Sequence, residues 1–162
     1  MARDVRKRMA QEIDKIPLFP GVSEMLQALV DQGLMLAVVS SNSEANVRAV
    51  LGPQNTAHFT LFNCGASVFG KAPKLKSVMK KCRVSPETVI LIGDEIRDLK
   101  SARDAQISFG AVTWGYTAES SLREHSPEEI FDHPQQILSA VRSGPSPHFP
   151  DPRPHPGKDA AG

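Results

Sequence analysis

The chain has 162 residues, of which 40% are hydrophobic and 23% are charged, and such values are typical of one soluble globular domain. Nineteen basic residues oppose eighteen acidic ones, so the formal net charge is +1. This balance argues against a nucleic-acid binder held by bulk charge, although a small phosphate site remains compatible with it. No apolar run approaches the ~20 residues that span a bilayer, and the N-terminus lacks the apolar core of a secretory signal. We therefore expect a soluble, cytoplasmic protein with neither a membrane nor a nucleic acid as partner.

The composition divides the chain into three parts. Residues 143–162 contain six of the 13 prolines, and such a segment buries too little apolar surface to offset its ordering entropy, so a disordered tail is predicted. Residues 1–17 are mostly polar and are predicted to be helical. The remaining residues, 18–142, alternate helical and strand patterns and are predicted to form the folded core.

The first half of this core begins with a helix. Apolar residues at helical spacing predict a helix over 22–32, and Gly33 is its predicted stop. The continuous apolar run at 34–40 predicts a strand that is covered on both faces, as in a parallel sheet. Asn42 or Ser43 is expected to cap the next helix, which ends at Gly52. A shorter strand is predicted at 58–63.

The second half continues the alternation. A helix is expected to open at Pro73, and the apolar sequence TVILIG at 88–93 predicts the strongest strand. The remaining predicted elements are a helix over 96–105, a strand over 108–113, a strand over 129–131 and a helix over 134–142. This alternation predicts an α/β domain in which helices cover a mainly parallel sheet.

Polar side chains follow the strand at 34–40. Ser40, Ser41 and Asn42 come directly after it and precede a helix, and ligands of open parallel sheets bind beyond the carboxyl ends of the strands. Hydroxyl groups, free backbone N–H groups and the positive end of a helix together suit a phosphate oxygen. The alternative is that Ser41, Asn42 and Ser43 do no more than cap the helix.

Acidic side chains follow the strand at 88–93. Asp94 lies at the strand end, and Asp98 lies four residues later in the first turn of the next helix, a spacing that can bring both carboxylates to one point. Hard oxygen ligands of this kind suit Mg²⁺. The alternative is that acidic residues simply favour a helix N-terminus, with Asp98 paired to Arg97 or Lys100.

A lysine lies between these two groups in the sequence. Lys71 stands in the loop FGKAPK before a helix, and from there it could reach a phosphate or a carboxylate. The four other lysines of that segment are expected to form its solvated face; they are Lys74, Lys76, Lys80 and Lys81.

Taken together and in this order, these elements resemble the haloacid dehalogenase superfamily, whose members are mostly phosphatases with a Rossmann-like three-layer core. The resemblance covers roughly residues 18–142. Ser40 in VVSSNS matches the second motif of the family, Lys71 in FGKAPK the third, and Asp94 with Asp98 in LIGDEIRD the acidic pair of the fourth. It implies Mg²⁺ held by the two aspartates, Ser40 and Lys71 in catalytic roles, and Ser41 and Asn42 near the phosphate.

The sequence departs from the family at its start. The first motif of the family, an apolar strand ending in DxDGT, should precede LFPGV at 18–22, but only the polar stretch ARDVRKRMAQEIDKIP stands there, and it is interpreted as a remnant of the cap. The family's nucleophilic aspartate therefore has no counterpart, and Mg²⁺ is expected to bind weakly. The resemblance also places the missing strand between those at 34–40 and 88–93, so two unpaired apolar edges are expected, open to a partner strand or to homo-oligomers.

Two functions are compatible with these features. The first is a phosphatase of small phosphorylated metabolites, phosphoglycolate-like compounds among them, which hydrolyses phosphomonoesters through an aspartyl-phosphate in complete relatives and is inactive as written. The second is a non-catalytic pseudo-phosphatase or interaction module that binds an anion or a partner strand.

Overall fold

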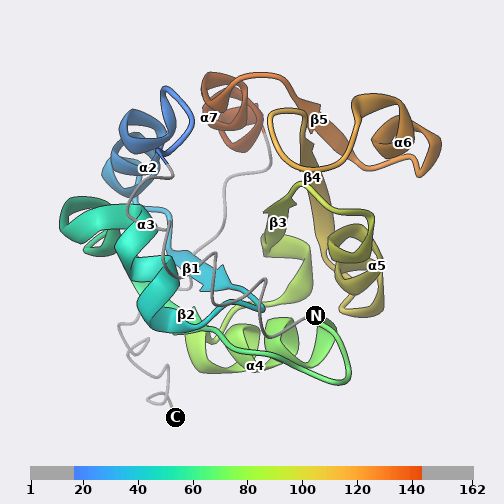
Figure 1. The fold of residues 1–162 in the computed structure, drawn as a ribbon, viewed down its shortest axis with the longest axis horizontal. Helices are drawn as coiled ribbons and strands as arrows, with labels where there is room; N and C mark the ends of the chain where they lie inside the picture. Colours follow the sequence, from blue (N-terminus) through green and yellow to red (C-terminus); the bar gives the residue numbers. More distant parts are fainter. Residues whose placement is uncertain (1–16, 144–162) are drawn as a thin grey trace, which may run out of the picture.

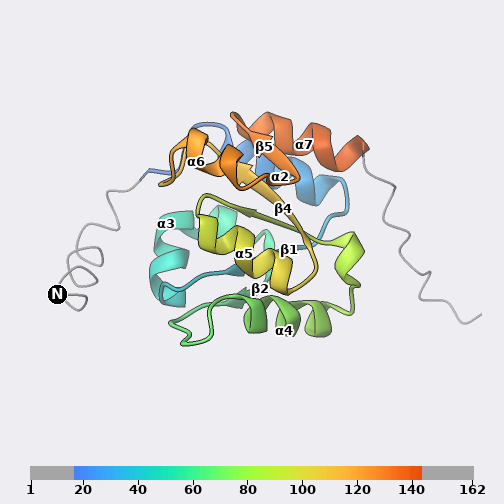
Figure 2. The ribbon, with the colours of Figure 1, turned by 90° about the vertical axis from the view of Figure 1, so that its right-hand side faces the viewer.

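Residues 17–143 are described by the computed structural model. Helices and parallel strands alternate along these residues (Figure 1). Helices α2 and α7 lie on one side of the strands and α4 lies on the other (Figure 2). The predicted three-layer α/β architecture is therefore confirmed.

The first half of the described chain contains α2 (Val22–Asp31), β1 (Leu36–Val39), α3 (Glu44–Thr56) and β2 (Phe59–Asn63). Helix α2 buries Met25, Leu26 and Leu29, the stripe that its apolar spacing predicts. Helix α3 consists of two helical parts joined at a kink: Gly52, with a non-helical backbone (φ 73°, ψ 165°), ends the first part as predicted, and Pro53 starts the second. Strands β1 and β2 pair in parallel.

The middle of the chain contains α4 (Ala72–Cys82), a 3₁₀ turn η2 (Pro86–Thr88), β3 (Ile90–Gly93), α5 (Ile96–Asp104) and β4 (Ser108–Val112). The strand predicted from residue 88 begins two residues later. The reason is local, since the Thr88 N–H donates to the Ser85 carbonyl at 3.0 Å and closes the turn. Strands β3 and β4 pair in parallel with Ile90 opposite Ser108.

The last elements are α6 (Glu119–Glu124), β5 (Glu129–Phe131) and α7 (Pro134–Ser143). The sequence pattern does not predict helix α6. It has six residues, of which Leu122 alone is buried, and a single apolar residue produces no helical periodicity. Strand β5 pairs with β4 in parallel, with Phe131 opposite Val112.

The strands form two separate sheets. Strands β1 and β2 make one, and β3, β4 and β5 make the other in that order. Within residues 17–143 no strand joins β1 to β3, so the expected pair of unpaired edges is present. The two strands flank a break in the middle layer of the domain.

This break changes the burial of the flanking strands. Continuous apolar sequence predicts full coverage of β1, but its residues are half-buried and Ala37 is exposed. Every residue of β3 is half-buried, whereas four of the five residues of β4 are buried. The prediction of full coverage is therefore wrong for β1, because the strand lacks a neighbour on one side.

Two hydrophobic clusters pack on the two faces of the sheets. One includes Leu75 of α4, Leu99 of α5 and Phe109 of β4, and the other includes Leu26 of α2, Phe131 of β5 and Leu138 of α7. Leu91 packs against the first cluster and Ile92 against the second, as expected for successive residues of a strand.

The predicted N-terminal helix and Pro-rich tail fall outside the described residues, apart from residues 17 and 143. Within 17–143 no helix is long and apolar enough to cross a membrane.

Candidate functional site

The first polar group of the site follows β1. The Ser40 hydroxyl accepts the backbone N–H of Asn42 at 3.1 Å, which leaves its own proton available to a ligand. The Asn42 carbonyl accepts the N–H of Gly65 at 2.7 Å, so the loop after β1 is tied to the loop after β2. Ser41 and Asn42 have exposed side chains.

Helix capping next to this group is done by another residue. The Ser43 hydroxyl accepts the Asn46 N–H at 3.2 Å and is the N-cap of α3. Neither Ser41 nor Asn42 makes such a capping bond in the described structure. The capping alternative therefore applies to Ser43, and Ser40, Ser41 and Asn42 are left at the end of β1 with no capping role.

Lys71 reaches the acidic group that follows β3. Its Nζ lies 2.6 Å from Asp98 Oδ1, and the two side chains are only 19% and 5% exposed. Lys71 is the N-cap residue of α4, and Asp98 lies in the first turn of α5. The pairing of Asp98 with Arg97 or Lys100 is not observed, because Arg97 pairs instead with Glu95, with Nη2 donating to Oε1 at 2.9 Å.

Three carboxylates gather where β3 ends. One oxygen each of Asp94, Glu95 and Asp98 lies within 4.8 Å of the others. Burial raises the pKa of Asp98 above its ordinary value, Lys71 opposes this rise, and the neighbouring charges of Glu95 and Asp94 add to it. The raised pKa means that the ionised form of Asp98 lacks sufficient compensation from the described residues.

These residues fit a divalent cation. Asp98 Oδ1 is buried and accepts no hydrogen bond of regular geometry within the described structure, and the Lys71 ammonium forms an ion pair with it. Clustered carboxylate oxygens are the ligands that Mg²⁺ prefers. A cation beside Asp94 and Asp98 would satisfy the buried oxygen and offset the repulsion among the three carboxylates.

Glycines allow the chain to approach both aspartates closely. A Cβ on Gly115 would lie 2.0 Å from Asp94 Cβ, and a Cβ on Gly93 would lie 2.9 Å from Asp98 Oδ2. The Tyr116 N–H donates to Asp94 Oδ2 at 2.7 Å. The loop after β4 therefore packs directly on Asp94 and orients its carboxylate.

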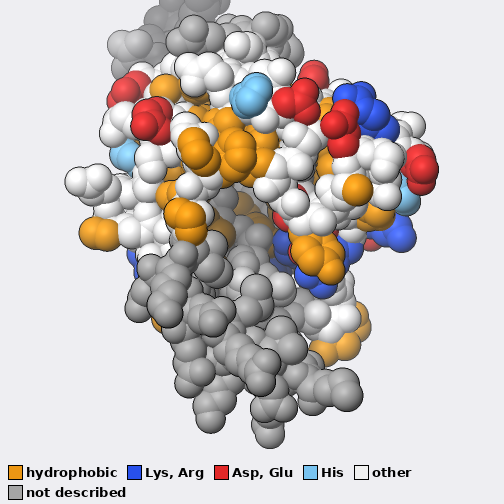
Figure 3. Space-filling model, turned by 45° about the horizontal axis from the view of Figure 1, so that its top comes forward, with side chains coloured by type: hydrophobic (Ala, Val, Ile, Leu, Met, Phe, Trp, Pro, Cys, Tyr) orange, Lys and Arg blue, Asp and Glu red, His pale blue; other side chains and the backbone are white. Residues whose placement is uncertain are grey.

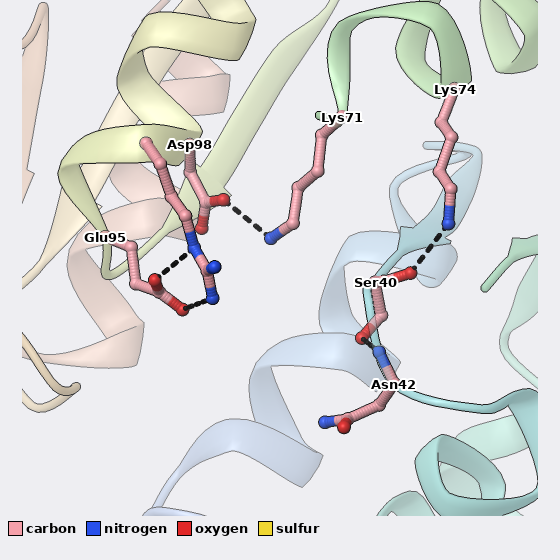
Figure 4. Close-up of polar contacts among 7 residues, drawn as sticks. Ser40, Asn42, Lys71, Lys74, Glu95 and Asp98 are labelled. Atoms are coloured by element: carbon pink, nitrogen blue, oxygen red, sulfur yellow. Dashed lines mark hydrogen bonds and ion pairs between the residues drawn. The ribbon is translucent and has the colours of Figure 1, made fainter. Parts of the chain in front are cut away.

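A second lysine of α4 belongs to the site, contrary to the sequence-based expectation. Lys74 is expected on the solvated face of the helix, but it is half-buried and its Nζ donates to the backbone carbonyls of Ser40, at 3.0 Å, and Gly65. In Figure 4 Lys71 extends from the start of α4 toward Asp98, whereas Lys74 extends toward Ser40. The spacing of three residues between the two lysines was the available signal, since it places them on neighbouring positions of a helix.

The aromatic residues after β4 have different environments. Trp114 stacks on Phe19 with ring centroids 5.1 Å apart and packs against the cluster of α2 and α7. The side chain of Tyr116 is 90% exposed. Trp114 therefore contributes to packing, while Tyr116 contacts the site through its backbone alone.

Known structures share this fold. A haloacid dehalogenase-like hydrolase from Streptococcus pneumoniae aligns with a TM-score of 0.73 at 22% identity, over 81% of this chain and 63% of that one. A predicted phosphoglycolate phosphatase from Haemophilus somnus aligns with a TM-score of 0.72 at 27% identity, over 82% of this chain and 61% of that one.

Curated relatives of similar sequence are phosphatases, most of them named phosphoglycolate phosphatase and one named N-acetylmuramic acid 6-phosphate phosphatase. The phosphoglycolate phosphatase of Synechococcus elongatus is 31% identical over 138 residues, which are 85% of this chain and 65% of that protein. The phosphoglycolate phosphatase of Haemophilus influenzae is 30% identical over 128 residues, which are 76% of this chain and 57% of that protein. The chain thus spans about three fifths of the length of the relatives it matches.

The family model called haloacid dehalogenase-like hydrolase matches residues 1–112, a range that includes Ser40, Lys71, Asp94 and Asp98. Given this match and the site that these four residues form, the chain belongs to the haloacid dehalogenase-like hydrolase family.

Proposed function

We propose that this chain is the core of a Mg²⁺-dependent phosphatase that acts on small phosphomonoesters, phosphoglycolate-like compounds being its substrate class. The observation that carries the proposal is the grouping of Ser40, Lys71 and Asp98 at the carboxyl ends of two strands, joined through α4. The names of the curated relatives support the choice of substrate class.

Each residue has a distinct part in this proposal. The Ser40 hydroxyl, whose oxygen already accepts the Asn42 N–H, donates its proton to a phosphoryl oxygen. Lys71 lies opposite the acidic group and neutralises charge that develops on the phosphoryl oxygens. Ser41 and Asn42, exposed beside Ser40, contact the substrate, and Lys74 holds the Ser40 backbone in place.

The acidic residues provide the metal site. Asp94 and Asp98 would hold Mg²⁺, with Glu95 close by. When bound, the cation supplies charge neutralisation for the phosphate. Asp94 is held by the Tyr116 N–H, so its carboxylate is oriented before any ligand arrives. We expect weak binding, because the carboxylate and the backbone carbonyl that the family's first motif supplies have no counterpart between β1 and β3 within residues 17–143.

The nucleophile is the missing part. In the family an aspartate carboxylate attacks phosphorus, but within residues 17–143 no strand lies between β1 and β3 to present one. We therefore propose that the chain has no turnover by itself. The broken sheet favours, as a second candidate, a non-catalytic protein that binds an anion or a partner strand.

Phosphate binding tests the site without requiring turnover. Isothermal titration of the full chain with inorganic phosphate in the presence of Mg²⁺ should show saturable binding. Ser40→Ala should weaken it by about tenfold, the equivalent of one lost hydrogen bond to a charged group. Ser120→Ala, at an exposed position on α6, is the matched control and should bind like the wild type. Equal affinity in the Ser40 and Ser120 variants would contradict the proposed site.

A further inference from the structure

We propose that Arg97 keeps the Glu95 carboxylate out of the coordination shell of the bound cation and so makes the site selective for Mg²⁺ over Ca²⁺. Arg97 has no part in the phosphatase chemistry proposed above, and here it is a positioning residue that acts through Glu95. This role rests on the proposed function, because it requires a divalent cation beside Asp94 and Asp98. It adds which cation the site takes and why.

The guanidinium of Arg97 contacts both carboxylate oxygens of Glu95. Nη2 donates to Oε1 at 2.9 Å, and Nε forms an ion pair with Oε2. Two such contacts at once make the strongest and most directional pairing of an arginine with a carboxylate. Figure 4 draws both contacts of Glu95 as dashed lines. A cation that took an oxygen of Glu95 would therefore have to displace the guanidinium or lie against its charge.

The backbone at the start of α5 permits this contact. Side chains two residues apart within a helix do not face each other. Glu95, however, precedes α5 as its N-cap residue and has an extended backbone, with φ −119° and ψ 143°. Its side chain makes no capping hydrogen bond with the helix. The Glu95 carboxylate is thus held by Arg97 in the first turn of α5, and not by the backbone N–H groups of the helix.

Arg97 also lies close to the whole acidic group. One oxygen each of Asp94, Glu95 and Asp98 lies within 4.8 Å of the others, and the side chain of Glu95 is only 29% exposed. The hydrogen bond with Glu95 raises the pKa of Arg97 above its ordinary value, and the charges of all three carboxylates add to this rise. Arg97 is therefore a counter-charge built into the group, and it occupies one of the three candidate ligands.

Ion pairs on the surface of the chain have a different setting. Arg48 and Glu44, for example, lie one helical turn apart on α3, and their side chains are 45% and 48% exposed. Figure 3 shows acidic and basic side chains scattered among uncharged ones over the face that it draws. Exposed pairs of this kind contribute little. The pair of Arg97 with Glu95 differs, because its glutamate is partly buried beside two other carboxylates.

The number of available ligands distinguishes the two cations. Mg²⁺ keeps several of its waters and is usually bound by one or two carboxylates, whereas Ca²⁺ takes about six to eight oxygen ligands in a flexible arrangement. With Glu95 bound to Arg97, the carboxylates of this group that remain for a cation are Asp94 and Asp98. Such a site suits Mg²⁺. Release of Glu95 would add a third carboxylate, from which Ca²⁺ gains more than Mg²⁺ does.

The ratio of the two affinities tests this role, because a change in net charge alters the binding of both divalent cations alike. NMR titrations of the full chain with MgCl₂ and with CaCl₂ measure each affinity from the amide signals of residues 94–98. We expect the wild type to bind Mg²⁺ more tightly than Ca²⁺. Arg97→Gln should raise the affinity for both cations and shift their ratio toward Ca²⁺ by about tenfold.

Two further variants separate ligation from charge. The double variant Arg97→Gln with Glu95→Gln removes the guanidinium and the carboxylate together, so its ratio should equal that of the wild type. Lys100→Gln, at an exposed position of α5, also removes one positive charge and should keep the wild-type ratio. The same spectra show whether each variant is folded.

Four results would overturn the proposal. They are a wild type that prefers Ca²⁺, an unchanged ratio in Arg97→Gln, the same shift in the double variant, and an equal shift in Lys100→Gln. Each of these results leaves the phosphatase proposal standing, provided that the wild type binds Mg²⁺. If neither the wild type nor Arg97→Gln bound either cation, both the role of Arg97 and the metal site of the phosphatase would be refuted.

Discussion

Lys71 Nζ lies 2.6 Å from Asp98 Oδ1, and this ion pair joins the N-cap residue of α4 to the first turn of α5. The two residues are 27 positions apart and belong to helices on the same face of the broken sheet. Asp98 is almost fully buried, so its charge depends on Lys71 and on any cation that binds beside it. The site and the stability of the domain are thus coupled through one carboxylate.

Removal of the Lys71 charge should destabilise the protein. Lys71→Met leaves a buried carboxylate without its cation, and we expect a loss of roughly 2 kcal/mol in the free energy of unfolding. This is below the range for a fully buried pair, because Lys71 keeps part of its surface in water. Urea denaturation measures the loss. Lys76→Met, at an exposed position of the same helix, should change stability by less than about 0.5 kcal/mol, and equal losses would contradict the coupling.

Replacement of Asp98 should have the opposite effect when no metal is present. Burial raises the pKa of Asp98, so the folded chain binds a proton at this site more readily than the unfolded chain does. The associated stability is present below the ordinary pKa and is lost as the pH rises through the raised value. In chelator, Asp98→Asn should therefore be more stable than the wild type at neutral pH, with the difference shrinking toward acid.

Thermal unfolding at several pH values, with and without Mg²⁺, checks this expectation. Mg²⁺ should raise the melting temperature of the wild type and leave that of Asp98→Asn unchanged, because the variant lacks one ligand. A stability difference that grows toward acid would show that folding lowers the pKa of Asp98, the reverse of the direction expected from its burial.

Crowding at Gly115 should affect the metal site through Asp94. Gly115→Ala adds a Cβ that would lie 2.0 Å from Asp94 Cβ, so the loop must move and the Tyr116 N–H must shift from Asp94 Oδ2. We expect a loss of about 1–3 kcal/mol in stability and a smaller stabilisation by Mg²⁺. Tyr116→Ala keeps the backbone donor and removes an exposed side chain, so this variant should still be stabilised by Mg²⁺. If both variants lost the stabilisation by Mg²⁺, the proposed role of loop packing would be refuted.

Lys74 should matter for the loop that carries Ser40. Lys74→Met removes charge-assisted hydrogen bonds to the carbonyls of Ser40 and Gly65, and we expect a loss of about 2 kcal/mol in the free energy of unfolding. Phosphate binding should weaken as well, because Ser40 is no longer held. Lys80→Met, at an exposed position of α4, serves as the control. An equal loss in its free energy of unfolding would mean that the removed charge, and not the contact with the loop, causes the destabilisation.

The order of elements and most of the site could be predicted from the sequence, because both depend on local patterns. Continuous apolar runs marked β1 and β3, and polar residues directly after them marked Ser40, Asp94 and Asp98. The two open sheet edges could also be predicted, because the family's first strand has no counterpart in the sequence. These features need no knowledge of distant contacts.

Other features depend on contacts between distant segments, and local patterns do not reveal them. Lys74 looks like its solvated neighbours along α4 until the loops of β1 and β2 bring two carbonyls to its Nζ. The apolar sequence of β1 does not predict that the strand is only half-buried, because its burial depends on a neighbouring strand that is absent from the described residues. The pairing of Arg97 with Glu95 leaves Asp98 to Lys71, a choice that the spacing alone did not decide.

The proposed lack of turnover is tested most directly by a phosphatase assay of the purified 162-residue chain with an aryl phosphate and with phosphoglycolate in the presence of Mg²⁺, beside an Asp94→Asn control. We predict no turnover above that of the control, because no carboxylate nucleophile is presented between β1 and β3 within the described residues. Turnover by the chain that disappears in Asp94→Asn would contradict this prediction, since another residue would then replace the missing aspartate.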